Sequence, residues 1–278
     1  MFKILHKRLL TGVTKLFVVE APLVARRAQP GQFLIVRVRE PGERIPLTIA
    51  DYDRSAGTVT IVVQEVGKTT RLLGALEEGE AILDVVGPLG RPAELPETGR
   101  VVLVGGGFGV APLLPKARAL KERGVHVTSV IGARNADLVI LEEELGARSD
   151  RMLVATDDGS RGRKGLVTDV LRDLLDAGEV VDEVIAIGPM IMMQAVAEAT
   201  RPAGIRTLVS VNPIMVDGTG MCGACRVTVG GQTRFACVDG PIFDGHAVDF
   251  AEAIRRSRMY RAEEQEALRV WEAAGCPR

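Results

Sequence analysis

Apolar and polar positions follow two different patterns along the chain, and the change between the two patterns comes close to residue 97. In residues 1–97, runs such as FLIVRVRE and GTVTIVVQEV are rich in β-branched residues and alternate in part between apolar and polar positions. Glycine and proline separate these runs, as in QPGQFLIV, where a turn precedes a strand. Short alternating runs with turn residues between them predict a small antiparallel β-barrel.

Beyond residue 97, continuous apolar runs take turns with segments that have helical periodicity. The expected buried strands are RVVLVGGG, VHVTSVIGARN, RMLVATDDGS, DEVIAIGP and IRTLVSVN. The expected helices between them are VAPLLPKARALKERG, DLVILEEELGARS, LVTDVLRDLLDAGE and MIMMQAVAEATRPAG. This alternation predicts a parallel α/β sheet with helices on both faces, which we place in residues 98–212.

The alternation ends after Asn212. Residues 213–250 contain a cysteine-rich loop and the segment CRVTVGGQTRFAC, which predicts a β-hairpin turned at Gly230 and Gly231. Residues 251–278 are charged and helix-prone, and we interpret them as a C-terminal helical tail. This tail is either a solvated helix or, because RRSRMYR is locally basic, an element that docks a partner. The expected fold is multidomain β plus α/β, with a small C-terminal domain.

Composition and charge exclude several classes of protein. The 278 residues carry a formal net charge of −1 and only 4% aromatic residues, so we expect neither a polyanion-binding surface nor base stacking on nucleic acid. The N-terminal sequence lacks the apolar core of a secretory signal, and no apolar run is long enough to cross a bilayer. These observations predict a cytoplasmic protein that binds neither nucleic acid nor membranes.

Three of the four cysteines lie close together in the segments DGTGMCGACRVTV and FAC. In a reducing cytosol, clustered cysteines more often hold a metal or take part in redox chemistry than form a disulfide scaffold. With an aspartate in the first place, the spacing D-x4-C-x2-C-x11-C matches the plant-type [2Fe–2S] pattern C-x4-C-x2-C…C. The ligands in this interpretation are Asp217, Cys222, Cys225 and Cys237.

Two alternatives stay open for this loop. A single tetrahedral zinc ion bound by one aspartate and three cysteines has similar spacing. In the other alternative, Asp217 only caps the loop, and Cys276 reaches back as the fourth ligand. His246 lies close by in sequence, but its spacing is not that of a ligand, and we interpret it as a surface or packing residue.

A glycine-rich turn follows the first strand of the α/β region, in VLVGGGFGVAPL. Glycines let a phosphate approach the backbone, and the start of the following helix offers free N–H groups and the positive end of the helix dipole. Because the spacing is not a strict G-x-G-x-x-G, a tight turn without a ligand is the alternative. More glycines are present than one turn needs, which favours a nucleotide: Gly105, Gly106, Gly107 and Gly109.

A pair of aspartates, Asp157 and Asp158, follows the strand RMLVAT. Ligands of open parallel sheets lie beyond the C-terminal ends of the strands. A carboxylate there accepts hydrogen bonds from a ribose diol and repels a 2′-phosphate, so a pair that faces the ribose would select NAD(H) rather than NADP(H). The alternative is an Asp–Gly turn that caps the loop.

The barrel region offers two further anion sites. In ERIPLTIADY, a half-buried Arg44 needs an anion, and a diphosphate supplies one through paired hydrogen bonds. The run GKTT lies just before an expected helix and is a second phosphate cradle. Alternatively, Arg44 pairs with Glu43 or Asp51 at the surface, and GKTT is an ordinary helix start.

Taken in order, the segments RIPLTIAD, GKTT, GPLG, GGGFGVAPL, TDDGS and IGPMIMM resemble the ferredoxin–NADP reductase superfamily. The C-terminal cysteine loop resembles one branch of it, the dihydroorotate dehydrogenase electron-transfer subunits. That branch includes the β subunits of sulfide dehydrogenase and the small subunits of NADH-dependent reduced ferredoxin:NADP oxidoreductase, and MVDGTGMCGACRV with FACVDGP is most similar to the last group. The resemblance covers nearly the whole chain. It implies a flavin-binding barrel in residues 1–97, a nicotinamide-binding sheet in residues 98–212 and a cluster domain in residues 213–250.

The resemblance also implies roles for individual residues. It puts Arg44 on the FAD diphosphate and Thr48 near the flavin ring. The positions that match the flavin motifs are Arg44, Pro46, Leu47, Thr48, Gly67, Lys68, Thr69 and Thr70. The positions that match the nicotinamide-nucleotide segments are Gly107, Gly109, Pro112, Asp157, Gly188, Pro189 and Met190. Many reductases have a cysteine directly before that Gly-Pro, where this chain has Ile187, and no residue is implied to act as a general acid or base.

The implied activity is that of an oxidoreductase subunit. Hydride from NADH carries two electrons, FAD accepts two and releases them singly, and a [2Fe–2S] cluster takes one. The chain would pass electrons to a larger catalytic subunit, in the favoured case within a bifurcating NADH-dependent ferredoxin:NADP oxidoreductase. Alternatives within the class are the sulfide dehydrogenase and dihydroorotate dehydrogenase subunits, although the latter have cysteine where this chain has Asp217. A zinc-stabilised nucleotide-binding regulator is the alternative from another class.

Overall fold

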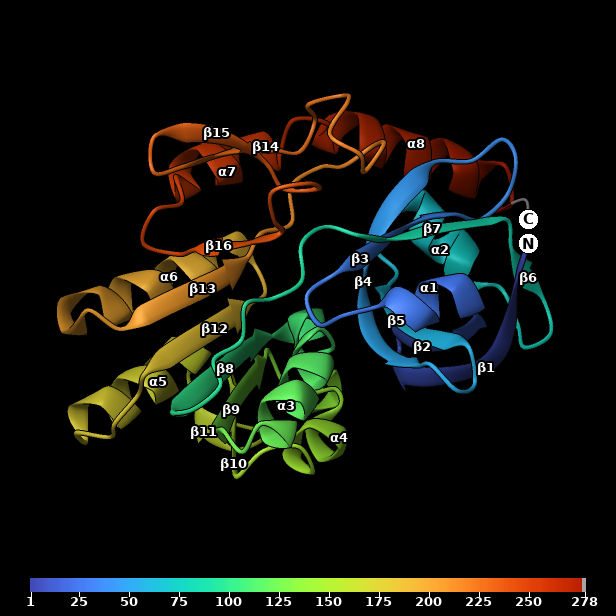
Figure 1. Cartoon of the computed structure of the whole chain (residues 1–278). Helices are drawn as coiled ribbons and strands as arrows, with labels where there is room; N and C mark the ends of the chain where they lie inside the picture. Colours follow the sequence, from blue (N-terminus) through green and yellow to red (C-terminus); the bar gives the residue numbers. More distant parts are fainter. Residues whose placement is uncertain (277–278) are drawn as a thin grey trace.

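The computed structural model describes residues 1–276. Its N-terminal part is a strongly curled antiparallel sheet with two short helices (Figure 1). The strands lie in the order β6-β1-β2-β5-β4-β3-β7. Their bounds are β1 (Phe2–Thr11), β2 (Thr14–Glu20), β3 (Phe33–Arg37), β4 (Arg44–Asp53), β5 (Thr58–Gln64), β6 (Ala81–Ile82) and β7 (Asp84–Leu89). The helices are α1 (Pro22–Arg27) and α2 (Lys68–Gly74).

One bent segment brings the two edges of this sheet together. Its first part, β6, pairs with β1, and its second part, β7, pairs with β3, both antiparallel. The enclosed space is filled by apolar side chains that alternate along the strands, among them Phe17, Leu34, Ile49 and Ile61, all almost completely buried. The antiparallel barrel expected from the alternating pattern is therefore confirmed.

The central part of the chain is a second sheet, in the order β11-β10-β9-β8-β12-β13-β16. All neighbouring strands in it are parallel except β16, which is antiparallel to β13. The strands are β8 (Arg100–Gly106), β9 (His126–Ala133), β10 (Arg151–Thr156), β11 (Arg163–Lys164), β12 (Glu183–Ile187), β13 (Arg206–Ser210) and β16 (Ile242–Asp244). The last strand comes from the cysteine-rich region, so that region is joined to the central sheet by backbone hydrogen bonds.

Helices cover both faces of the central sheet, as the alternation predicted (Figure 1). They are α3 (Leu113–Glu122), α4 (Glu142–Gly146), α5 (Val167–Asp176) and α6 (Met190–Thr200), with short 3-10 turns η1 (Gly107–Val110), η2 (Ala136–Leu138) and η3 (Arg201–Ala203). Apolar residues of α3 and α4 pack into one core, and those of α5 and α6 pack into another.

One expected helix is much shorter than its pattern indicated. The segment DLVILEEELGARS forms only the five-residue α4, preceded by η2. Ile140 and Leu141 are buried in the core beside α3, and Leu141 takes a positive φ of 56°. Tertiary packing of these two side chains thus overrides the local helical tendency, because a left-handed residue interrupts a right-handed helix.

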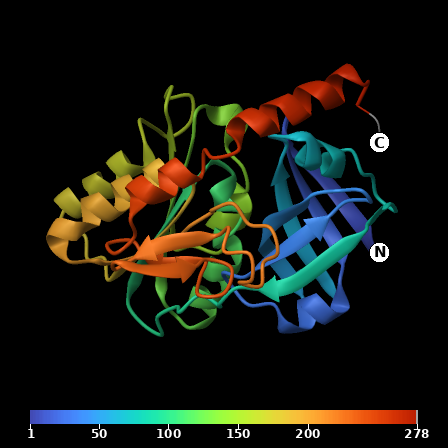
Figure 2. The same ribbon diagram turned by 90° about the horizontal axis from the view of Figure 1, so that it is seen from above.

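The C-terminal part forms a hairpin and two helices. The hairpin strands are β14 (Arg226–Val229) and β15 (Gln232–Phe235), and the helices are α7 (Phe250–Arg256) and α8 (Arg261–Ala273). Gly230 and Gly231 both have positive φ, of 58° and 74°, as the tightest hairpin turns require. Figure 2 shows α8 extending from the cysteine-rich region to the barrel, where Glu272 forms an ion pair with Arg71 of α2. No helix within residues 1–276 combines the length and the apolar character that a membrane span needs.

Candidate functional site

The barrel, the central sheet and the segment after β13 meet around one cavity of about 110 Å³. Six residues predicted from the sequence line it, three from β4 and three from the α/β region. They are Pro46, Leu47, Thr48, Gly109, Pro112 and Gly188. Segments that are more than 140 residues apart in the chain are therefore gathered at one place, which supports the expected joint flavin and nicotinamide site.

The topology explains this meeting. The parallel strands β8 and β12 are neighbours, and Gly105 pairs with Ile187, so the turns that follow these strands lie side by side. Ligands of open parallel sheets bind at this end. The barrel presents β4 to the same place, with Leu47 buried in the barrel and its neighbours Pro46 and Thr48 half-buried.

The cavity also has lining residues that sequence reasoning missed. They are Phe33, Phe108, Ile187, Ser210, Val211, Asn212, Pro213, Met215 and Pro241. One signal was available for the group that begins at Ser210, because it follows a parallel strand at its C-terminal end, where ligands are expected. Nothing comparable marked Phe33 or Pro241, which reach the cavity through the curl of the barrel and through β16.

The four glycines at the end of β8 and in η1 have different reasons to be glycine. A Cβ on Gly109 would lie 2.4 Å from the carbonyl oxygen of Ile187, and one on Gly106 would lie 2.4 Å from the sulfur of Met192. A Cβ on Gly105 would also collide with neighbouring side chains. Only Gly107, with a φ of 56°, has open space at that position. Internal packing thus explains three of the four, and Gly107 is the one that leaves the backbone accessible to a phosphate.

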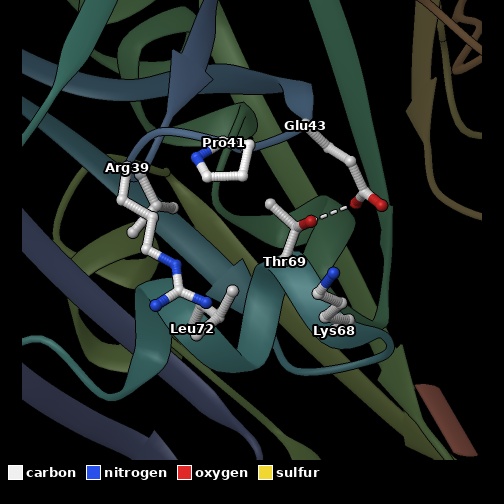
Figure 3. A pocket seen from close by; sticks show the side chains of 8 residues that line it. Arg39, Pro41, Glu43, Lys68, Thr69 and Leu72 are labelled. Atoms are coloured by element: carbon white, nitrogen blue, oxygen red, sulfur yellow. Dashed lines mark hydrogen bonds between the residues drawn. The ribbon is translucent and has the colours of Figure 1, made fainter. Parts of the chain in front are cut away.

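A second hollow of about 350 Å³ lies on the barrel, between the β3–β4 loop and α2 (Figure 3). Its lining residues are Val38, Arg39, Pro41, Gly42, Glu43, Lys68, Thr69 and Leu72. Two members of the predicted GKTT cradle are among them, and Figure 3 shows both on the side of Glu43, which accepts a hydrogen bond from the Thr69 hydroxyl. Within residues 1–276, no carboxylate forms an ion pair with Lys68, so the ammonium group is available to an anion.

The other two members of the cradle shape the turn. The hydroxyl oxygen of Thr70 accepts hydrogen bonds from the N–H groups of Val66 and Gly67, both at 3.0 Å. These contacts satisfy two donors next to the start of α2. The N-cap alternative is therefore correct for Thr70. Because the Thr69 hydroxyl donates to Glu43, the group that remains for a ligand is the ammonium group of Lys68.

Arg44 lies on β4 between the two hollows. Its Nε donates to the carbonyl of Val216 at 3.3 Å, and its Nη2 lies 3.5 Å from the carbonyl of Asp217. Pairing with Glu43 or Asp51, the alternative drawn from the sequence, is wrong, because Asp51 pairs with Arg118 and Arg148 instead. Arg44 is exposed rather than half-buried as expected, because its side chain extends from the first residue of β4 toward the backbone of the cysteine-rich loop.

The two aspartates after β10 differ in their surroundings. The carboxylate of Asp158 accepts hydrogen bonds from the N–H and the hydroxyl of Ser160, at 2.9 and 2.6 Å, and these bonds lower the pKa of Asp158. Asp158 therefore forms the turn that was considered as an alternative. Asp157 is exposed at the end of the strand, and its side chain is the one that remains for a ligand.

The predicted cluster ligands come together as two pairs. The Sγ of Cys222 lies 3.4 Å from a carboxylate oxygen of Asp217, and the Sγ atoms of Cys225 and Cys237 lie 3.2 Å apart. The N–H group of Thr219 and other donors of the loop lower the pKa of Asp217 to about 2, which keeps it ionised. Burial and the hydrogen bond with Cys225 raise the pKa of the Cys237 thiol to about 12 when no metal is bound.

Two pairs fit a binuclear cluster better than a single ion. A zinc ion needs its ligands around one point, and within residues 1–276 no three histidine, cysteine, aspartate or glutamate side chains converge in that way. A [2Fe–2S] cluster has two protein ligands on each iron, which matches two separate pairs. The loop around the pairs is built on positive-φ glycines: Gly218, Gly220 and Gly223.

Two other sequence candidates lie away from the loop or serve packing. Cys276 is exposed and follows α8, which reaches α2 of the barrel through the ion pair between Glu272 and Arg71, whereas Asp217 is the residue that contacts Cys222. The Nε2 atom of His246 lies 3.0 Å from the hydroxyl of Thr200, which also contacts Thr207 at 2.6 Å. His246 therefore links the segment after β16 to the end of α6, as the packing interpretation predicted.

Comparisons with known proteins agree with this geometry. Residues 212–249 match the iron–sulfur cluster binding domain of dihydroorotate dehydrogenase B. A dihydroorotate dehydrogenase B (NAD+) electron transfer subunit homolog of Thermotoga maritima is 52% identical, over 90% of this chain and 88% of its own length. The electron transfer subunit of Geobacillus thermodenitrificans is 37% identical, over 86% of this chain and 94% of its own length. The chain belongs to this family of electron transfer subunits and their homologues.

A solved structure extends the comparison to the whole fold. It comes from a study of flavin-based electron bifurcation in NADH-dependent reduced ferredoxin–NADP oxidoreductase. The two chains are 47% identical and superpose with a TM-score of 0.93, covering 98% of each. This chain therefore shares the fold of that structure over nearly its whole length, and the expected fold class is confirmed.

Proposed function

We propose that the chain is the electron-transfer subunit of a larger oxidoreductase and binds FAD, NAD(H) and a [2Fe–2S] cluster. The observation that carries the proposal is the cavity in which the barrel, the nucleotide-type turns and the segment leading to the cysteine loop meet. A cofactor held there would be in contact with all three parts of the molecule.

The order of residues along β4 fits an elongated dinucleotide. Pro46, Leu47 and Thr48 line the central cavity, Arg44 follows, and Glu43 lines the second hollow. A flavin ring would occupy the first place, the diphosphate would pair with Arg44, and Lys68 beside the second hollow would add a further cation. Arginine suits this position because its guanidinium binds phosphate through two parallel hydrogen bonds.

The nicotinamide nucleotide would enter from the central sheet. Gly107 leaves the backbone open next to the start of α3, where a phosphate is stabilised. Gly188, Pro189 and Met190 continue β12 beside the cavity, and Asp157 would accept hydrogen bonds from the ribose diol. This arrangement favours NAD(H).

The residues that line the central cavity include no acidic, basic, histidine or cysteine side chain. Acid–base catalysis is therefore not what this site is built for, and its walls serve to exclude water and to hold two rings in contact. When bound, the flavin exchanges a hydride with the nicotinamide and passes electrons singly to a one-electron centre. Asp217 and the three cysteines would hold that centre in two ligand pairs.

The electrons would pass from the cluster to a partner subunit. The family consists of electron transfer subunits, and the residues that line the central cavity leave no titratable group for a further organic substrate. In the favoured case the partner belongs to an NADH-dependent ferredoxin–NADP oxidoreductase that bifurcates electrons. A sulfide dehydrogenase or dihydroorotate dehydrogenase partner is the second candidate. Four unpaired cysteines agree with a place in the reducing cytoplasm.

Anaerobic purification tests the proposal. We expect a yellow-brown protein with about one FAD, two irons and two sulfides per chain, a larger subunit that co-purifies, and bleaching of the flavin bands by NADH. An Asp217→Cys variant should keep the cluster but change its electron paramagnetic resonance signal, because an oxygen ligand is replaced by sulfur. A colourless protein that contains zinc would sink the proposal and favour the nucleotide-binding regulator.

A further inference from the structure

The cluster loop is held from outside by arginine side chains that donate to its backbone carbonyls. Arg44 of the barrel holds the start of the loop, as described above. At its other end, Arg226 Nη1 donates to the carbonyl of Gly223 at 3.3 Å, and Arg256 Nη2 donates to the carbonyl of Ala224 at 3.1 Å. Arg256 is the one that comes from the C-terminal helices, a region without an assigned role so far.

The position of Arg256 relative to the cysteines is set by packing. It is the last residue of α7, and Phe250 at the start of this helix is buried in the same core as Cys225 and Cys237. The side chain of Asp249 caps the start of the helix through a hydrogen bond to a backbone N–H. The helix that bears Arg256 therefore packs into the same hydrophobic core as Cys225 and Cys237, two of the four proposed ligands.

Within residues 1–276, one N–H group of Arg256 has no acceptor, and its positive charge has no carboxylate partner. Its Nε is buried and has no hydrogen-bond partner there, and none of the carboxylates in that range forms an ion pair with its guanidinium. A buried cationic donor without an acceptor costs free energy and is rare in native proteins. An anionic group at the adjacent loop would remove that cost.

The contact with Ala224 also orients the next peptide group. Within residues 1–276 the cis peptide bonds all precede proline, so the bond between Ala224 and Cys225 is trans. In a trans peptide the carbonyl and the following N–H point in opposite directions. Because the carbonyl of Ala224 points to Arg256, the N–H of Cys225 is directed to the opposite side of the loop.

We propose that Arg256 is a positioning residue for the cluster and raises its reduction potential. The inference rests on the proposed function. The loop would hold an anionic cluster, which gains one further negative charge when it accepts one electron. A cation that no carboxylate neutralises stabilises the reduced form more than the oxidised form, since its attraction grows with the charge of the cluster. The hydrogen bond to Ala224 keeps that cation against the loop.

Redox titration of the intact anaerobic protein tests this role. The cluster is titrated with dithionite as the one-electron donor, and its reduced fraction is followed by electron paramagnetic resonance. In Arg256→Gln, we expect the equilibrium constant for reduction to fall about tenfold, which is about 59 mV for a one-electron couple. Arg256→Lys, which keeps the charge, should recover most of this loss.

Arg255→Gln is the matched control. It removes the same charge from the neighbouring residue of α7, whose side chain is exposed and forms no hydrogen bond to the loop within residues 1–276, so the potential of this variant should stay close to that of the wild type. If Arg256→Gln loads no cluster, restored iron content in Arg256→Lys supports the role, whereas failure in both variants overturns it, because a retained positive charge would then not be what the cluster needs.

Equal potentials in Arg256→Gln and Arg255→Gln would overturn the inference. That result is distinguishable from failure of the proposed function. If the proposed function fails, the wild type itself will contain no iron and no sulfide. If only the role of Arg256 fails, every variant will carry the cluster, and all of them will have the same reduction potential.

Discussion

Among single residues, Lys116 stands out as a lysine that is completely buried. It lies on α3, and its Nζ donates to the carbonyl of Pro112, one helical turn closer to the central cavity, at 3.1 Å. Burial lowers the pKa of Lys116 to about 7. Burying this lysine destabilises the folded state at any pH where the unfolded side chain is charged. The folded protein must then either bury a charge or release a proton, and both cost free energy.

We expect Lys116→Met to stabilise the chain, and to do so more at low pH than at high pH. The unfolded lysine holds its proton up to a pKa of about 10.4, and the folded one releases it near 7. The unfolded state therefore binds more protons between these values, so wild-type stability rises with pH across that window. The gain in the free energy of unfolding should be about 2–4 kcal/mol at pH 6 and under about 1 kcal/mol near pH 10.

Urea unfolding of both proteins at the two pH values measures this gain. Lys121→Met serves as the control, since Lys121 lies on the same helix but is partly exposed and pairs with Asp150 at 2.6 Å. The change that Lys121→Met makes in the free energy of unfolding should not become smaller as the pH rises. A gain for Lys116→Met that is the same at pH 6 and pH 10 would contradict the shifted pKa.

In the proposed site, Asp157 would decide the choice between NAD(H) and NADP(H). Its exposed carboxylate would repel a 2′-phosphate by about 1 kcal/mol, the scale for like charges a few ångströms apart in water. Asp157→Asn should therefore raise kcat/KM for NADPH relative to NADH roughly fivefold. The ratio is measured as NADH- and NADPH-dependent reduction of a dye, with Asp158→Asn as the control that disturbs only the turn. An unchanged ratio in the Asp157 variant would reject the assignment.

At the scale of elements, the turn from β8 through η1 to α3 contains one glycine that packs against a neighbouring strand and one that leaves the backbone open to a ligand. Gly109 is pressed against the end of β12, whereas Gly107 faces open space. The same glycine run thus closes the contact between two strand ends and leaves one stretch of backbone accessible. The sequence marked the turn correctly, but it could not distinguish the two kinds of glycine because the neighbour of Gly109 comes from β12.

Alanine at these two glycines should give opposite phenotypes. Gly109→Ala should lower the free energy of unfolding by about 2–3 kcal/mol, since its Cβ would overlap a backbone oxygen that cannot move freely. Gly107→Ala should cost only about 1–2 kcal/mol, for a non-glycine residue at positive φ, but should weaken NADH binding about tenfold. Thermal unfolding and NADH titration of the two variants check this, and the reverse order of effects would show that Gly107 is a packing residue.

Most strands and helices were predictable within a few residues because each carries its own apolar period. The exceptions were elements whose state depends on distant residues. The helix expected over DLVILEEELGARS shrank to α4 because Ile140 and Leu141 are drawn into the core beside α3. Likewise β16 is too short to carry a pattern of its own, and only its pairing with β13 makes it a strand.

At the scale of the whole molecule, Arg44 connects the barrel to the cysteine loop. It lies between the two hollows of the proposed flavin site, and it donates to the backbone at Val216 and Asp217. A single guanidinium is thus in a position to influence both the flavin and the loop that carries the first cluster ligand.

We expect Arg44→Ala to lose most of its FAD and to broaden the electron paramagnetic resonance signal of the cluster. Loss of the guanidinium removes charge-assisted hydrogen bonds worth about 1.5–3 kcal/mol each, so FAD should bind at least tenfold more weakly. Flavin absorbance per chain after dialysis measures the retention. Arg54→Ala is the control, because Arg54 stacks on Tyr52 at another part of the barrel. Full flavin retention in Arg44→Ala would reject the assigned diphosphate site.

The sequence by itself determined the barrel and the parallel sheet, and it supplied the candidate site residues and the spacing of the proposed cluster ligands, because periodicity, turn chemistry and ligand spacing are local properties. Tertiary structure alone decided which of these residues meet. It brought β4, the end of β12 and the segment after β13 to one cavity, sorted the glycines into packing and open positions, and turned Arg256 onto the cysteine loop. Such contacts join residues far apart in the chain, and they depend on the curl of the barrel and the order of the strands, which no local pattern encodes.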